Sequence, residues 1–267
     1  MPRISLETVV SLPPRPISRR VARELLRLAF EEFQWFKPAQ YGFGSRNPPP
    51  EGPIEYDYIL EALSSKGSAI VIGRTDDYFL FLGVPEEPYR HIGKFSWVVP
   101  ARKAAKASWR EEHQRQVVHL MQLLDSPLAY SALVNDIEAK GNRLVKKEFG
   151  SSLEFTVSNY SQGLAGVYWR NFYGAPFIRL FGERLRALPP ECVTWLGEER
   201  VLVQPYGLPT EAGSEEARTQ ERRFIHLLGP ECFYDFEHHL VPTRVPERLP
   251  TPDDWPVWSV TRLKEDP

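Results

Sequence analysis

Residues 163–189, GLAGVYWRNFYGAPFIRLFGERLRALP, form the most distinctive stretch of this chain. Aromatic residues crowd its first half, and an amphipathic run follows Pro176. Because proline lacks an amide proton and clashes with the preceding turn, it cannot continue a helix. We therefore expect a short helix at 165–173, a break at Gly174-Ala175 and a second helix with Pro176 at its first position. The apolar face of the second helix would be Phe177, Ile178, Phe181, Leu185 and Leu188, which indicates scaffold rather than a site.

Outward from this stretch, apolar runs bounded by turn residues predict strands. The clearest is a hairpin formed by SAIVIGR at 68–74 and YFLFLGV at 78–84. A second hairpin is expected at 192–204, around the turn Gly197-Glu198-Glu199. Further strands are expected at 3–12 (an edge or first strand), 94–99, 128–134 and 153–157. Residues 136–150 are charged, and we expect a mobile segment there.

Helices are predicted where apolar residues recur at helical spacing after a capping residue. The first expected helix begins after Ser18 and runs toward Pro38, and the second spans 54–65 and ends at Gly67. The third begins at Ser108, with Glu111 completing a capping box, and the fourth begins after Ser214. The last has the face Ala217, Glu221, Phe224, Ile225 and Leu228. Residues 38–53 are expected to be a loop. Gly42 and Gly44 in it lack the preceding strand and the lysine of a phosphate-binding loop.

These elements predict an α+β fold with antiparallel or mixed sheets and packed helices. A helix, a hairpin, a proline-bearing loop and a serine-capped helix occur in that order twice, as expected of two related α/β halves. We divide the chain into an N-terminal half (1–135), a C-terminal half (136–239) and a proline-rich tail (240–267), within one compact body. The tail is expected to wrap the body, because Trp255 and Trp258 would otherwise be exposed.

Composition narrows the classes of function. The 267 residues carry a net charge of −2, which supplies no global field for nucleic acid or anionic membranes. A basic segment at 102–110 leaves a nucleic-acid contact as an alternative, although a solvated loop is favoured. Two cysteines do not form a disulfide framework, and there is no apolar run of signal-peptide or membrane-span length. We expect a cytoplasmic protein that binds neither membrane nor nucleic acid.

Catalytic patterns are weak in this sequence. His226, Cys232, His238 and His239 lie within 14 residues, but their spacing matches no common zinc pattern. No G-x-S-x-G motif is present, and a buried thiol is inert as a nucleophile. We therefore expect no catalytic residues, no metal and no cofactor. An enzyme with a metal or carboxylate site remains the alternative.

Pairs of carboxylates recur at predicted turns and loops. Each pair has a simple interpretation as a solvated turn, but together they would steer the approach of a basic partner protein. The residues expected to contact such a partner are Asp76, Asp77, Glu86, Glu87, Glu198 and Glu199.

The motif GVYWRNFYGAPF at 166–177, followed by a helix ending in L-x-x-L-P, a hairpin and a proline-rich loop, resembles the type VI immunity family. That family is an uncharacterised-domain group encoded beside secreted toxin effectors of bacteria. The resemblance is best over 163–229, and the first half agrees only in the order of its elements. It implies a protein that neutralises a cognate toxin, often a nuclease delivered by a type VI secretion system, by forming a stoichiometric complex. The family has no known catalytic residues, so none is assigned here.

Overall fold

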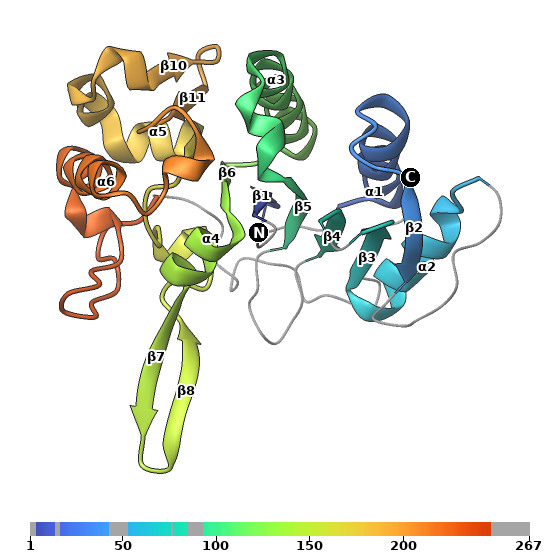
Figure 1. Cartoon of the computed structure of the whole chain (residues 1–267), viewed down its shortest axis with the longest axis horizontal. Helices are drawn as coiled ribbons and strands as arrows, with labels where there is room; N and C mark the ends of the chain where they lie inside the picture. The colour runs from blue at the N-terminus through green and yellow to red at the C-terminus, as the bar shows by residue number, and fades with distance from the viewer. Residues whose placement is uncertain (1–3, 14–16, 43–52, 76, 85–92, 247–267) are drawn as a thin grey trace. The chain divides into compact units, whose positions relative to one another are not determined.

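The computed structural model describes residues 4–13, 17–42, 53–75, 77–84 and 93–246. The described residues form two compact units that meet in the chain at the Ser126–Pro127 bond. Unit 1 precedes this bond and unit 2 follows it (Figure 1). Among the described residues, no helix combines the length and the apolar content that crossing a membrane requires.

Unit 1 contains five strands paired antiparallel in the order β1-β5-β4-β3-β2. Their bounds are β1 Ser5–Ser11, β2 Pro38–Gly42, β3 Ser68–Gly73, β4 Phe79–Gly83 and β5 Lys94–Pro100. The predicted hairpin at 68–84 and the strands at 3–12 and 94–99 are confirmed. The loop expected at 38–53 is wrong in its first residues, because Pro38–Gly42 pairs with β3 as a strand.

The helices of unit 1 are α1 Arg19–Arg27, continued by a π-helical turn at Leu28–Glu32, α2 Tyr56–Lys66 and α3 Ala107–Leu124. Ser18 caps α1 as predicted, since its Oγ accepts a hydrogen bond from the Val21 amide at 3.2 Å. Gly67 ends α2 in the left-handed conformation with φ 73°. The predicted capping box of Ser108 and Glu111 is wrong. Helix α3 begins one residue earlier, at Ala107, without a side-chain cap.

A tryptophan stack lies in the core of unit 1. Trp35 lies flat against Trp97, with ring centroids 4.0 Å apart, and its indole N–H donates to Gln116 Oε1 at 2.8 Å. The hydrogen bond satisfies the only polar group of the buried indole. The ring is therefore held in place by stacking, and its orientation is fixed by the hydrogen bond. Four apolar residues at helical spacing on α3 are all buried, namely Val117, Leu120, Met121 and Leu124.

Unit 2 contains four antiparallel strands in the order β10-β11-β9-β6, with bounds β6 Leu128–Leu133, β9 Arg170–Gly174, β10 Val193–Trp195 and β11 Arg200–Val203. A separate antiparallel hairpin consists of β7 Asn142–Lys147 and β8 Gly150–Phe155. The helices are α4 Val134–Gly141, α5 Ala175–Phe181 and α6 Glu215–Leu228. The strand at 128–134, the hairpin at 192–204 and the Ser214 cap of α6 are confirmed.

The helix expected at 165–173 is wrong. Residues 170–174 form strand β9, which lies between β6 and β11 and is buried along its whole length. A strand covered on both faces shows a continuous apolar run instead of alternation, and aromatic residues favour strands. The helix predicted after it is confirmed only as far as Phe181, as α5 with Pro176 in its first turn, and a 3-10 helix at Gly182–Ala187 follows it. Of its expected core face only Ile178 is not fully buried.

Residues 136–150 are also more ordered than predicted. They supply most of α4, all of β7 and the turn into β8. The prediction of a mobile segment here is therefore wrong, because most of its charged residues lie on helix α4 and strand β7. The fold class itself, α+β with antiparallel sheets, is confirmed. A duplication of the two halves stays a prediction, and residues 247–267 of the tail lie outside the described residues.

Candidate functional site

The carboxylates predicted to contact a partner belong to several turns. Glu198 and Glu199 are exposed in the β10–β11 turn, and neither makes an ion pair or hydrogen bond to another residue that the structure describes. Trp195 lies beside them at the end of β10 and is 49% exposed. Asp77 lies half-buried in the β3–β4 turn of unit 1. The other three members of the predicted set, Asp76, Glu86 and Glu87, lie outside the described residues.

The histidines and cysteine near the end of unit 2 have separate surroundings. Cys232 is buried, and burial raises the pKa of its thiol to about 11. His238 Nδ1 lies 2.7 Å from Asp235 Oδ2, and the hydrogen bond to that carboxylate raises the pKa of His238. His226 is exposed on α6. Within the described part of the chain, no three histidine, cysteine or carboxylate side chains are grouped to hold a metal ion.

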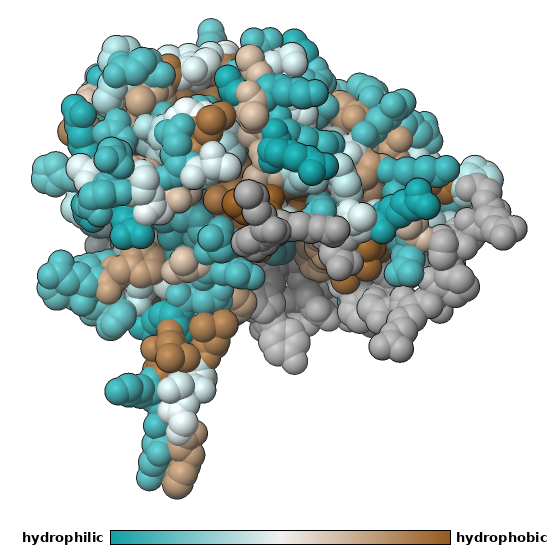
Figure 2. Space-filling model, viewed as in Figure 1, coloured by the Kyte–Doolittle hydropathy of each residue, from teal (hydrophilic) through white to brown (hydrophobic). Residues whose placement is uncertain are grey.

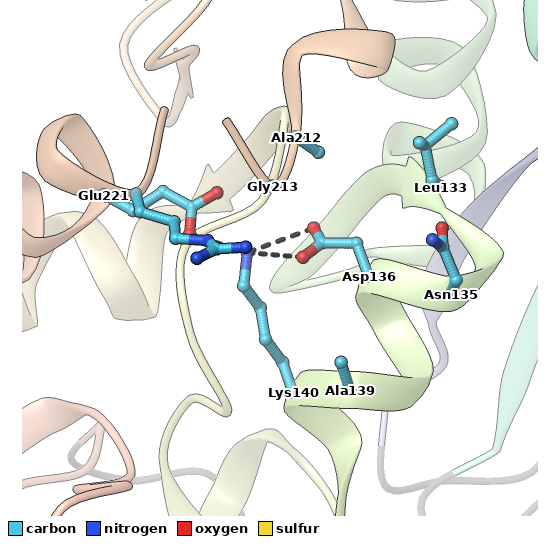
Figure 3. A pocket seen from close by; sticks show the side chains of 9 residues that line it. Leu133, Asn135, Asp136, Ala139, Lys140, Ala212, Gly213 and Glu221 are labelled. Carbon is cyan, nitrogen blue, oxygen red and sulfur yellow. Dashed lines mark hydrogen bonds and ion pairs between the residues drawn. The ribbon is translucent and has the colours of Figure 1, made fainter. Parts of the chain in front are cut away.

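A polar cluster around Lys140 lies in the interior of unit 2. Figure 3 shows Asp136 and Glu221 pointing toward the Lys140 ammonium from opposite sides. Lys140 Nζ lies 2.9 Å from Asp136 Oδ1 and 2.9 Å from Glu221 Oε2, with all three side chains between 11% and 15% exposed. It also donates to the carbonyl of Val167 at 2.7 Å. An ammonium has three donors, so this one is fully engaged.

Glu221 has the most perturbed environment in the cluster. Burial raises its pKa, and the Lys140 ammonium opposes that rise to a smaller degree. Its second oxygen accepts a hydrogen bond from the Tyr206 hydroxyl at 3.0 Å. Burial and the nearby Glu221 carboxylate raise the pKa of Tyr206 as well. Both groups therefore hold their protons more tightly than they would in water.

The cluster borders a pocket of about 250 Å³. Its lining residues are Leu133, Asn135, Asp136, Ala139, Lys140, Ala212, Gly213, Arg218 and Glu221. A carboxylate enzyme of the alternative hypothesis would need two available carboxylates that converge on a substrate. Asp136 and Glu221 do converge here, but both are bound to Lys140. The arrangement ties α4 to α6 and to the segment before β9.

Sequence reasoning missed this cluster, although one signal for it was available. Glu221 occupies a position on the predicted apolar face of the 215–228 helix. A buried carboxylate requires a charged or hydrogen-bonding partner, so an acidic residue on an inward face predicts a cation opposite it. The identity of that cation, Lys140, depends on a contact between residues 81 positions apart and is not encoded in local spacing.

The β7–β8 hairpin extends away from the rest of unit 2 (Figure 1). Its register pairs Leu144 with Leu153 and Asn142 with Phe155, so these side chains share one face. The apolar members of this face are exposed: Leu144 69%, Leu153 68% and Phe155 63%, with Phe149 of the turn at 93%. Figure 2 shows apolar residues near the root of the hairpin and at its tip, with more polar residues between them. We call these four residues the apolar hairpin face.

The opposite face of the hairpin is charged and polar except for Val145. Arg143 and Lys147 both form ion pairs with Glu154, which is paired directly opposite Arg143 on the neighbouring strand. The base of the hairpin is tied to the body of unit 2. Thr156 Oγ1 donates to the Lys140 carbonyl at 2.6 Å, and Arg143 donates to the Tyr234 hydroxyl at 3.2 Å. The last turn of α4, through the backbone carbonyl of Lys140, therefore supports the root of the hairpin.

Comparisons with known proteins give a structural likeness. No family model matches the chain, and no curated protein matches it. Its structure is similar to that of a solved protein described as "Pseudomonas aeruginosa T6SS protein PA0821", with a TM-score of 0.50 over 84% of this chain and 72% of that one. The sequence identity is 14%, so the likeness shows a shared fold.

Proposed function

We propose that this protein is an immunity protein, which binds a cognate secreted bacterial toxin in the cytoplasm and neutralises it by forming a stoichiometric complex. The observation that carries the proposal is the β10–β11 turn. It presents two carboxylates without described partners, Glu198 and Glu199, beside the exposed Trp195. Tryptophan is among the residues that most often dominate binding energy, and unpaired carboxylates steer a basic partner.

Two further observations support this function. The motif at 166–177 resembles the type VI immunity family. The solved structure of similar fold is described as a T6SS protein, where T6SS denotes the type VI secretion system. A toxin of nuclease type would fit the acidic turns, because an enzyme that binds the phosphate backbone presents a cationic surface. Asp77 lies in the β3–β4 turn of unit 1, and Asp76, Glu86 and Glu87 stay sequence predictions of further acidic contacts.

The test is co-expression with the effector encoded beside this gene. We expect the two proteins to co-purify in a fixed ratio, and cells that express the effector to survive only with the immunity protein. The variant Glu198→Gln/Glu199→Gln should bind more weakly. Glu61→Gln/Glu138→Gln, which removes the same charge from exposed helix positions, is the matched control. The proposal is abandoned if the wild-type protein neither forms a complex with the effector nor protects the cells.

A further inference from the structure

We infer that the β7–β8 hairpin is the main docking element for the toxin, and that its apolar hairpin face enters an apolar cleft whose rim carries carboxylates. This inference rests on the proposed function and adds the surface that binds and the chemistry of the surface it meets. The Lys146 ammonium lies on the same face as Leu144, two residues further toward the turn. It makes no ion pair with any residue that the structure describes.

The area of the apolar hairpin face suits the centre of an interface. Single exposed apolar residues are ordinary on a protein surface, but a contiguous patch marks an interaction site. Phe155 offers roughly 150 Å² of contact area or more at the root of the hairpin, where it lies next to the Leu144–Leu153 pair, and Phe149 offers a further contact at the turn. A standard interface covers about 800 Å² on each partner. The hairpin would therefore supply the central contacts, and neighbouring surface of the protein would supply the rim.

The anchoring of the hairpin favours tight binding. A two-stranded hairpin alone is marginally stable in water. This one is held at its root by Thr156, which is 4% exposed, and by the Arg143–Tyr234 hydrogen bond. Its polar face is held by the two ion pairs to Glu154. An element already in its binding geometry loses less conformational entropy when a partner orders it.

A second copy of the chain is a poorer occupant than a toxin. If two apolar hairpin faces packed together, each would bring Lys146 into the interface. None of the paired strand residues on this face is a carboxylate, because Glu154 lies on the opposite face and is engaged by Arg143 and Lys147. An unpaired ammonium buried in an interface is costly. A different protein with carboxylates at the rim of its cleft would pair with it.

A membrane is a poorer occupant for a different reason. The outer edges of β7 and β8 pair with no other strand among the described residues. The backbone N–H and C=O groups along both edges therefore lack a hydrogen-bond partner on a neighbouring strand. Such groups cannot find hydrogen bonds inside a bilayer. Glu148 also precedes Phe149 in the turn and would enter the bilayer with it. In the cleft of a protein, backbone and side-chain groups can satisfy these edges.

The experiment compares Leu144→Ser/Leu153→Ser with the wild-type protein in binding to the purified effector encoded beside this gene. The control, Val145→Ser, changes an apolar residue of the same strand that points to the opposite face. We expect the double variant to lose at least about 30-fold in affinity and the control to stay within about threefold. Lys146→Glu should weaken binding about tenfold. Thermal unfolding should be nearly unchanged, because the replaced leucines are exposed.

The outcomes separate this inference from the proposed function. If the wild-type complex forms and the double variant binds equally well, the hairpin is not the docking element, and the immunity function stands. If the wild-type protein binds no effector, both fall. Two other results would overturn the inference: binding of the wild-type protein to vesicles of phosphatidylcholine and phosphatidylglycerol, or self-association of the wild-type protein seen by sedimentation. Each counts only if the double variant abolishes that binding or self-association. Faster hydrogen exchange in the hairpin after deletion of 247–267 would also overturn the inference, since the chain's own tail would then cover the apolar hairpin face.

Discussion

Lys140 joins three parts of unit 2 through a single ammonium group. It contacts Asp136 on α4, Glu221 on α6 and the Val167 carbonyl before β9. A buried ion pair of this kind contributes little net stability compared with an apolar replacement of the whole group. Removal of one member is different, because the others are left charged and unpaired in the interior. The role of Lys140 is therefore best tested by removing its charge alone.

The variant Lys140→Met retains most of the apolar stem and removes the ammonium. We expect it to lower the free energy of unfolding by about 3–5 kcal/mol, since Asp136 and Glu221 lose their counter-charge. Urea denaturation measures the change. Lys146→Met, at an exposed position without a described ion pair, should stay within about 0.5 kcal/mol of the wild type. Equal stabilities of the two variants would contradict the assigned role of the cluster.

Glu221 predicts a dependence of stability on pH. Its folded-state pKa is raised above the ordinary value of 4.5, mainly by burial. The folded state therefore binds this proton more tightly than the unfolded state. The contribution of Glu221 to the free energy of unfolding is therefore complete below its ordinary pKa, and it is lost as the pH rises through the raised folded-state pKa. We expect the unfolding free energy of the wild type, minus that of Glu221→Gln, to fall as the pH increases through this window.

Urea denaturation of both proteins across a series of pH values tests this expectation. The same comparison with Glu216→Gln, at an exposed position one turn earlier on α6, should give no such fall. A difference for Glu221 that is constant would show that Lys140 balances the effect of burial, and one that grows with pH would show that Lys140 outweighs it.

At the scale of elements, β9 is the strand whose type the sequence pattern misjudged. The burial of all five of its residues explains the error, because a strand buried on two faces loses its alternation. The segment before it is held by the side chain of Asn171, which is 2% exposed. Asn171 accepts from the Tyr168 amide at 2.9 Å and donates to the carbonyls of Tyr168 at 2.8 Å and Val203 at 3.1 Å.

We expect Asn171→Ala to destabilise the protein by about 2–3 kcal/mol, because three buried backbone groups lose their hydrogen-bond partner. The control, Asn135→Ala, changes an exposed residue of α4 and should cost little. Thermal and urea unfolding give the two values. If Asn171→Ala were as stable as the control, water or a shifted backbone would have to replace these bonds, and β9 would not depend on them.

At the scale of the whole molecule, the charge is close to neutral, so any electrostatic steering must come from local turns. Glu198 and Glu199 are the best described example. Reversal of both, Glu198→Lys/Glu199→Lys, should lower the association rate constant with the effector about tenfold at low salt. The deficit should shrink as added salt shortens the Debye length toward roughly 3 Å at 1 M.

Stopped-flow measurements over a range of salt concentrations test this prediction. Glu61→Lys/Glu138→Lys introduces the same charges elsewhere and serves as the control. A change confined to the dissociation rate constant, or one independent of salt, would mean that the turn acts by direct contact or not at all. The expected effect on the association rate is distinct from that of the hairpin variants, which should mainly speed dissociation.

Local interactions determined what the sequence alone could predict. Several features depend on residues only a few positions apart: the α+β class, the hairpins at 68–84 and 192–204, the Ser18 and Ser214 caps, and the start of α5 near Pro176. Backbone sterics and capping hydrogen bonds act over that range. These features can therefore be found from spacing without knowledge of the rest of the chain.

Only the tertiary structure decided the identity of β9, the partners of Lys140 and the exposure of the hairpin. Leu153 and Phe155 alternate as the residues of a half-buried strand do, and the pattern cannot say whether a surface of the same chain covers them. In the folded protein none of the described residues does so, and the two side chains are 68% and 63% exposed. Burial is a property of which distant elements meet, and the spacing of neighbouring residues does not determine that.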